Sequence, residues 1–444
     1  MKITHFPEKI IWFQSLFIYP IYLSGTLFIF NLLQLWILVG YALFWQIKLS
    51  VEPTNRINSI DIRHWRSIPL LIWGWLISMI LMGVTILIGV YENGYDSNEM
   101  IRSTISWMGG WSLLGIYPLL GYLLPIRPAV IYRSACVIAA QSLIAIPICY
   151  GAYLLKLPGL IYLSPLERII QNGKVYYFIS WYTREVDSDG NGIRLALFTP
   201  WGPALGLIGC IFLFYALEEQ TPVWKWLGIV GSLAMVIVSV SRGAYLFLPA
   251  TVAIVWVIRN LSFIQFQLSL GISCFLGGLG STFLLDRFQE FFGGVKSARK
   301  SSSQLRGELE RVAFDRWTDS PIFGHGKQIQ GPDFLKHMPI GSHHTWIGLL
   351  FTQGLMGFCL FFTPVVWSLI ELSLKAKSNP IAHIALKVLI VVVFASFSDN
   401  IEKLSYIYWS AFLLIGTAYR EVSPPSSWDL GGRNPLHDLP SQST

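Results

Sequence analysis

The sequence predicts an all-α, polytopic membrane protein with about twelve transmembrane helices, and three observations support that fold class. The 444 residues are 53% hydrophobic and 13% charged, with a mean hydropathy of +0.54, whereas a soluble domain carries roughly 25% charged residues. Apolar runs of the roughly 20 residues that a helix needs to cross a bilayer recur along the chain. Lys and Arg are concentrated in the short loops between those runs, as in membrane proteins.

Twelve apolar runs define the predicted spans. An even number places both chain ends on the same side of the membrane. The spans lie at 10–29, 31–48, 68–90, 105–125, 129–150, 195–217, 224–241, 244–258, 262–282, 346–371, 381–398 and 404–419.

The distribution of basic residues orients these spans with the N terminus in the cytoplasm. In that orientation Lys48, Arg63 and Arg127 fall in inner loops, whereas the acidic residues Glu92 and Asp96 fall outside. Short inner loops of membrane proteins are enriched in Lys and Arg. The net charge of +7 is therefore explained by topology and does not indicate nucleic-acid binding.

Two long segments, at about 151–194 and 283–345, then lie on the outer side. In the second, apolar residues between Gln304 and Trp317 recur at helical spacing, which predicts an amphipathic helix. A tight turn at Gly324-His325-Gly326 follows it. We expect this segment to fold as a cap between the ninth and tenth spans. The tail at 421–444, rich in proline and serine, is expected to be disordered in the cytoplasm.

All five cysteines lie in apolar runs, and none has the spacing of a CxxC or a Cys/His metal site. We expect free thiols buried in the core or against lipid. The cysteines are Cys136, Cys149, Cys210, Cys274 and Cys359.

Polar motifs gather on the predicted outer face. Ser241-Arg242-Gly243 joins the seventh and eighth spans, and Gly341-Ser342-His343-His344 precedes the tenth. Charged groups at a membrane edge are costly and often functional. Arginine binds phosphate oxygens through two parallel N–H donors, and histidine exchanges protons near neutral pH. The outer face is therefore the expected place of a functional site.

Three sequence elements resemble the O-antigen ligase and polymerase superfamily, which comprises bacterial membrane glycosyltransferases of the C type. Ser241-Arg242-Gly243-Ala244 matches the family's SRG element. Arg306, fifteen residues before Pro321-Ile322-Phe323-Gly324-His325-Gly326, is similar to the family's Arg and Pro-x-x-Gly-x-Gly turn. His343-His344, nine residues and Gly354-Leu355-Met356-Gly357 resemble the ligase pattern, in which Asn, Ser or Gln usually follows the first His. The resemblance covers roughly residues 190–400.

The resemblance divides the chain into N-terminal transmembrane helices at 1–190, a ligase-like core at 191–420 and the tail. It implies transfer of a glycan from a polyprenyl (undecaprenyl) diphosphate carrier to an acceptor hydroxyl, on the periplasmic face of the bacterial inner membrane. The setting would be assembly of surface polysaccharide or lipopolysaccharide. The implied partners are that donor, a glycan or lipid A core acceptor, and membrane lipids. Neither a cofactor nor a metal is implied.

Chemistry and resemblance together give each candidate residue an expected role. Arg242 and Arg306 would stabilise the diphosphate leaving group, and His343 would accept or orient the acceptor proton; these three are the catalytic candidates. The predicted substrate-binding residues are Ser241, Arg194, Arg311 and His344. Outer carboxylates are alternative bases that the sequence does not rank: Glu185, Asp187, Asp189, Asp315 and Asp319.

These polar residues also have ordinary structural explanations. Arg242 would snorkel to lipid phosphate, Arg306 would pair with Glu310 four residues on, and the histidine pair would cap the tenth span. His325 is expected to be a turn residue. Arg133, near the cytoplasmic end of the fifth span, is expected to snorkel.

Three other functions stay open. A repeat-unit polymerase would use the same donor with a different acceptor. A secondary transporter, such as a bicarbonate carrier, would place ionisable groups near the bilayer midplane, whereas the predicted spans are nearly free of charge at their centres. A non-catalytic role in polysaccharide assembly is the third.

Overall fold

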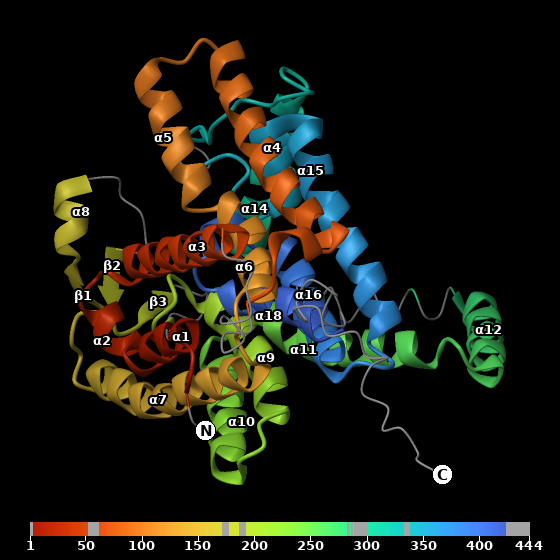
Figure 1. Ribbon diagram of the computed structural model, residues 1–444. Coiled ribbons are helices and arrows are strands. Elements are labelled where there is room, and N and C mark those ends of the chain that lie inside the picture. The colour runs from red at the N-terminus through yellow and green to blue at the C-terminus, as the bar shows by residue number, and fades with distance from the viewer. Residues whose placement is uncertain are drawn as a thin grey trace, which may run out of the picture.

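The structure is a computed structural model that describes residues 3–51, 62–170, 177–185, 192–281, 300–332 and 338–422, together with Leu285 and Arg287. Helices dominate the described part, as predicted (Figure 1). The strands in it are short and follow the fifth predicted span. Strand β1 (Leu160–Leu163) pairs antiparallel with β2 (Phe178–Ser180), and β3 (Thr183–Glu185) pairs antiparallel with β4 (Gly192–Arg194). The predicted tail at 421–444 lies almost wholly outside the described residues.

Within the described residues, five helices are long and apolar enough to cross a membrane. Together with the shorter apolar helices, they make the chain a multi-pass membrane protein. Every predicted span overlaps at least one observed helix, while the count of twelve spans stays a prediction. The five long helices are α3 (Leu27–Val51), α4 (Leu70–Glu92), α7 (Pro128–Leu154), α11 (Arg242–Asn260) and α15 (Thr345–Lys375); the shorter ones are α9 (Gly202–Leu217), α10 (Pro222–Val238), α12 (Ile264–Leu279) and α16 (Pro380–Ser396).

Three predicted spans are interrupted in the structure. The first becomes α1 (Phe6–Leu16) and α2 (Ile18–Leu23), and the last begins with a separate turn, α17 (Ile401–Leu404), before α18 (Trp409–Val422). The fourth is split at Gly109-Gly110 into α5 (Ser97–Met108) and α6 (Trp111–Leu123). An added Cβ at Gly110 would lie 3.1 Å from the carbonyl oxygen of Glu402. This close approach to the turn α17 explains why a glycine stands at the break.

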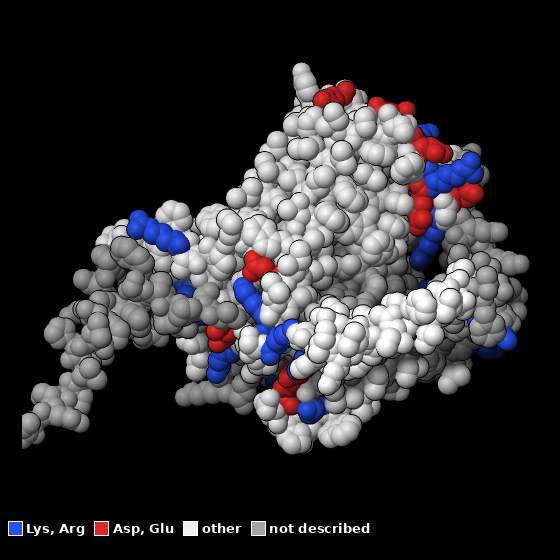
Figure 2. Space-filling model, turned by 90° about the vertical axis from the view of Figure 1, so that its right-hand side faces the viewer, with Lys and Arg blue, Asp and Glu red and all other residues white. Residues whose placement is uncertain are grey.

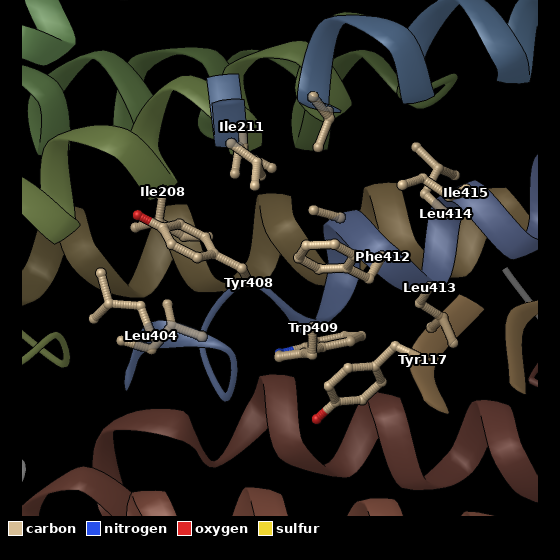
Figure 3. Close-up of a cluster of buried hydrophobic side chains, with 14 of the residues drawn as sticks. Tyr117, Ile208, Ile211, Leu404, Tyr408, Trp409, Phe412, Leu413, Leu414 and Ile415 are labelled. Carbon is tan, nitrogen blue, oxygen red and sulfur yellow. The ribbon is translucent and has the colours of Figure 1, made fainter. Parts of the chain in front are cut away.

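The densest part of the core surrounds α18. This helix packs against α6 and α16, and α6 in turn packs against α4. Figure 3 shows Tyr408 and Phe412 between Ile208 of α9 and Tyr117 of α6. An added Cβ at Gly416 would collide with the carbonyl of Pro118. The glycine therefore allows α18 to lie directly on the α6 backbone.

Contacts join segments that the topology prediction places on the same side. Among the outer segments, Asn93 donates to the carbonyl of Gly324 at 3.1 Å, and the ammonium of Lys327 lies 3.4 Å from the carboxylate of Glu99. Among the inner ones, Arg127 donates to buried Glu8 at 2.7 Å. Figure 2 shows charged side chains at the top and in the middle and lower part of one face, with an uncharged area between them. The orientation of the chain in the membrane stays a prediction.

The expectation that Arg133 snorkels to lipid is wrong. Its side chain is buried and donates to the carboxylate of Glu219, with a distance of 2.9 Å from Nε to Oε2. The guanidinium also lies 5.5 Å from the ring centroid of Trp224. A carboxylate and an aromatic face therefore stabilise this charge inside the protein.

The cysteine prediction is confirmed, because all five thiols are free. Cys136, Cys149 and Cys210 are buried. Cys274 and Cys359 are exposed on the apolar helices α12 and α15.

Candidate functional site

The turn between α10 and α11 carries the first predicted motif. Val240 has a positive φ of 47°, and Ser241 caps α11, its hydroxyl accepting a hydrogen bond from the amide of Ala244 at 3.3 Å. Arg242 is the first residue of the helix. An N-cap serine satisfies a backbone donor that the helix itself leaves unpaired. The role of Ser241 seen here is therefore to fix the helix end that holds Arg242.

Arg194 comes to the same turn from the β3–β4 hairpin. Its guanidinium Nη2 donates to the carbonyl of Val240 at 3.0 Å, two residues before Arg242. The backbone is attached as well, since the amide of Leu195 donates to the carbonyl of Val238 at 3.1 Å. An added Cβ at Gly202 would collide with the Arg194 side chain, so a glycine at the start of α9 leaves room for it. Two predicted site residues from separate segments therefore meet at one turn.

Asp399, between α16 and α17, is the main site residue that sequence reasoning missed. It is buried, and Trp201 Nε1 donates to its Oδ1 at 3.0 Å. Burial raises the pKa of the Asp399 carboxyl to about 7, although the positive charges of Arg306 and Arg194 oppose the rise. A buried carboxyl whose pKa lies near neutrality, and on which two arginine charges act, is a candidate for proton transfer.

The missed signal lies in the sequence itself. The five residues Asp399-Asn400-Ile401-Glu402-Lys403 separate the last two predicted spans, and four of them are polar. The topology prediction places them on the outer side with the other polar motifs. A search of the short outer loops as well as the long ones would have found Asp399.

His343 is held in an unusual backbone conformation beside this loop. Its φ is +67°, and its amide donates to Oδ1 of Asn400 at 2.6 Å. A left-handed conformation costs a non-glycine residue about 1–3 kcal/mol and is often retained at functional sites. Burial lowers the pKa of His343 to about 4, with the positive charges of Arg306 and Lys403 acting in the same direction. The imidazole is therefore neutral at neutral pH and is able to accept a proton or a hydrogen bond.

Arg306 lies on α14 (Lys300–Trp317), the amphipathic helix predicted in the second outer segment, which packs against α15. Its charge acts on His343 and Asp399. It acts on Glu310 too, opposing the burial that raises the pKa of that carboxyl. The surface pairing with Glu310 therefore accounts for only part of the surroundings of Arg306.

Arg311 does not share this position. It is exposed, and five residues correspond to about 140° around an α-helix at 3.6 residues per turn. Its side chain therefore leaves α14 on a different side from Arg306. The substrate-binding role of Arg311 stays a prediction.

His344 has the structural role that the capping hypothesis gave it. It is the N-cap of α15, and its Nδ1 accepts a hydrogen bond from the amide of Ile347 at 3.3 Å. Its ring meets the ring of Phe397 edge-on, with centroids 5.7 Å apart. Asn and Ser, which the ligase pattern has at this place, are favoured N-caps. A cap explains why different residue types serve here.

Replacing His344 by asparagine should therefore leave activity within about threefold of the wild type, because asparagine caps a helix as well as any residue. Glycan transfer by the purified variant is the measurement, and His344→Leu, which cannot cap, is the matched control with an expected loss of thermal stability. An inactive but stable His344→Asn variant would show that the second imidazole takes part in the chemistry.

The two glycine motifs form one structural unit. The turn at 321–326 fits into a break in α15, where Gly354 has φ 62° and ψ −163°. The amide of Leu355 donates to the carbonyl of Pro321 at 2.8 Å, and the amide of Gly326 donates to the carbonyl of Thr352 at 2.7 Å. An added Cβ at Gly324 would lie 2.5 Å from the amide nitrogen of Gly354. These glycines allow backbone to meet backbone beside the site.

Gly354→Ala should destabilise the protein strongly. The observed conformation is essentially restricted to glycine and costs another residue about 1–3 kcal/mol, and the new Cβ would also collide with the carbonyl of Ile322. Thermal unfolding in detergent is the measurement. Gly271→Ala in α12, where an added Cβ meets nothing within 4 Å, should unfold no earlier than the wild type. Equal unfolding temperatures for the Gly354→Ala variant and the wild type would contradict this account.

His325 is a turn residue, as expected. Its ring is buried between hydrogen-bonding groups, with Nε2 3.0 Å from the carbonyl of Arg316 and Nδ1 3.3 Å from Oδ1 of Asn93. Both ring nitrogens are therefore occupied in packing the turn against α14 and the end of α4.

For the carboxylates predicted as alternative bases, the structure gives little evidence of a role. Asp315 and Asp319 are exposed. Asp187 and Asp189 lie outside the described residues. With Ser188 between them they form an Asp-x-Asp sequence in the first outer segment, and carboxylates are typical ligands of Mg²⁺ and Mn²⁺. This pair runs counter to the expectation of metal-free chemistry.

Residues 227–362 match the family model described as O-antigen ligase. The match contains all three sequence elements of the resemblance, and it confirms the predicted relationship to the O-antigen ligase superfamily. Arg194 and Asp399 lie outside the matched residues. No curated protein matches the chain.

Proposed function

Taking the O-antigen ligase match at 227–362 as the premise, we propose that this membrane protein transfers a glycan from a polyprenyl (undecaprenyl) diphosphate carrier to an acceptor hydroxyl. The reaction takes place at the periplasmic face of the bacterial inner membrane, in the assembly of lipopolysaccharide or another surface polysaccharide. The observation that supports this proposal is that the charge of Arg306 acts on both buried Asp399 and His343, while the amide of His343 donates to Asn400, the residue next to Asp399.

The arginines stabilise the leaving group. The acceptor oxygen forms a bond with the anomeric carbon of the glycan while the bond from that carbon to the diphosphate oxygen breaks, and the diphosphate keeps the electron pair. Fixed cations aimed at this developing charge lower the barrier most where water is excluded. Arginine suits the task, because its guanidinium stays charged and binds two phosphate oxygens at once. Arg242 and Arg306 have this role, and Arg194 positions the turn that carries Arg242.

The acceptor proton passes to His343 or to Asp399. His343 is neutral at pH 7 and ready to accept it, but a group with a pKa of about 4 is a weak base. Asp399, whose pKa is about 7, is the stronger base. We assign His343 to contact with the acceptor hydroxyl, with Asp399 as the second group that can take the proton.

An apolar cavity near Arg194 suits the lipid part of the donor. Its volume is about 270 Å³, and its wall includes Tyr19, Ile144, Ile148 and Leu197. Leu197 is three residues from Arg194. An isoprenoid chain would bury apolar surface there while its diphosphate lies at the arginines.

The pH dependence of transfer should follow Asp399. Because burial raises the pKa of this carboxyl to about 7, and the ionised form is required, kcat/KM should fall as the pH drops through 7 and level off above about 8. His343 adds no change in this range, since its pKa is about 4. The profile of Asp399→Asn should lack the step near 7. A wild-type profile that is flat from pH 5.5 to 9 would remove Asp399 from the chemistry.

The products decide between ligase and polymerase. Purified protein in lipid nanodiscs is given a polyprenyl diphosphate oligosaccharide and a lipid A core acceptor, and the products are identified by mass spectrometry with and without a chelator. Glycan on the core, in both conditions, is expected from the ligase pattern at His343. Longer lipid-linked chains would mean a polymerase, and loss of activity with chelator would mean that the reaction needs a metal, with Asp187 and Asp189 as the first residues to replace.

A further inference from the structure

Besides the apolar cavity, a charged cavity lies at the C-terminal end of α11. We call it the basic cavity; its volume is about 460 Å³, and its wall includes Trp256, Arg259, Phe263, Lys377, His383 and Lys387. Arg259 is in the last turn of α11, and His383 and Lys387 are in the first half of α16. Figure 2, which views the side of α12, shows Lys and Arg side chains on the lower part of that face.

The basic cavity is separate from the proposed active site. Arg242 and Arg259 lie at opposite ends of α11, 17 residues apart, which corresponds to about 25 Å at 1.5 Å per residue. Arg259 and Lys377 fall in inner loops of the predicted topology, whereas Arg242 falls on the outer face. A ligand in this cavity therefore cannot touch the groups around Asp399.

Among the described residues, the basic cavity holds more positive than negative side chains. Arg259 acts electrostatically on both His383 and Lys387, and Glu218 is the carboxylate that acts on Lys387. In the part of the chain that the structure describes, Arg259, Lys377 and Lys387 thus lie near a single acting carboxylate, that of Glu218. In the described part of the chain, the buried Nδ1 of His383 also has no hydrogen-bond partner. Like charges held together are unfavourable unless an anion joins them.

The wall of the basic cavity also contains apolar side chains, which limit the kind of ligand that fits. Trp256 and Phe263 line the same space as the cations, together with Val252 and Val255. A ligand that satisfies both parts carries an anionic head and hydrocarbon. The inner leaflet of bacterial and other membranes attracts basic residues through its anionic lipids, and basic pockets between transmembrane helices bind their head groups.

We propose that the basic cavity binds the phosphate of an anionic phospholipid from the cytoplasmic leaflet. Arginine and the two lysines hold the phosphate oxygens, and the aromatic side chains contact the first part of the acyl chains. This site is independent of the proposed glycan transfer, because its ligand needs no glycan donor.

Native mass spectrometry of the full-length protein tests the proposal. Protein exchanged into detergent receives phosphatidylglycerol or phosphatidylcholine at equal concentration, and the bound fraction is measured. Arg259→Gln/Lys387→Gln should bind at least about fivefold less phosphatidylglycerol than the wild type, as expected when two phosphate contacts worth about 1 kcal/mol in total are lost. Arg259→Lys keeps the charge and should keep binding. Lys48→Gln, at the end of α3 and outside the cavity, is the matched control.

Competition distinguishes the source of the phosphate. Phosphatidylglycerol retained in the presence of excess inorganic phosphate supports a lipid site, whereas displacement of the lipid by inorganic phosphate would overturn the lipid proposal in favour of a soluble phosphate ligand. Equal binding of both lipids, or equal phosphatidylglycerol binding by the wild type and the double variant, would also overturn it. If the double variant fails to stay folded, Lys377→Gln provides the same test at a residue on the cavity rim.

Discussion

Arg306→Ala should lower the rate of glycan transfer by about 10²- to 10³-fold, the loss typical of removing one preorganised group that stabilises developing negative charge. Arg306 acts on both His343 and Asp399, and it comes from α14, a helix outside the long apolar spans. The loss should appear in kcat, because the interaction is strongest when the bond to the diphosphate breaks.

The test of Arg306 is turnover by purified protein, with membrane abundance and thermal unfolding as folding controls. Arg316→Ala is the matched variant, since Arg316 is exposed on the same helix and its contact with His325 is made by its backbone carbonyl, which the substitution keeps. It should keep near-wild-type turnover. Near-normal turnover by a folded Arg306→Ala variant would exclude the leaving-group role.

His343→Ala should reduce transfer by about 10²- to 10⁴-fold, the range for a lost proton-transfer group. The loss has a possible structural cause, because His343 has φ +67° and alanine tolerates that conformation poorly. His343→Asn separates the two causes, since asparagine adopts the left-handed region more readily but does not accept a proton. The account predicts that both variants are folded and nearly inactive.

The two His343 variants also distinguish a role in proton transfer from a role in orienting the acceptor. A His343→Asn variant that recovers substantial activity would show that the residue orients the acceptor by hydrogen bonding, with Asp399 as the base. Wild-type activity in His343→Ala would show that the imidazole has no part in the reaction.

The apolar runs located the helices because burial in lipid leaves a strong compositional signal. The ends of the helices were predicted less well where specific contacts determine them. Asp96 caps α5 by accepting from the amide of Glu99 at 3.0 Å, so this amphipathic helix starts well before the predicted span at 105. The break at Gly109-Gly110 depends on the approach of the chain at Glu402. A window of hydropathy contains no information on such long-range contacts.

The residues of the candidate site that belong to local motifs could be proposed from the sequence. Arg306 and His343 were found through their spacing, and Arg194 through its position before a span. Asp399 was missed because its importance comes from burial beside Trp201 and two arginines, which only tertiary packing creates. Arg311 is exposed on the same helix as Arg306, and its predicted role is untested. The two glycine motifs are visible in the sequence. That the turn at 321–326 fits into the break of α15 at Gly354 is visible only in the structure.

The central claim is that this protein breaks the bond between a glycan and a lipid diphosphate with arginines at one site. Release of polyprenyl diphosphate from a defined donor, by purified protein in nanodiscs, measures this step directly. The account predicts release that depends on an acceptor hydroxyl and is lost in both Arg242→Ala and Arg306→Ala. Intact donor after incubation with folded wild-type protein and the organism's own glycans would contradict the account and favour a transport function.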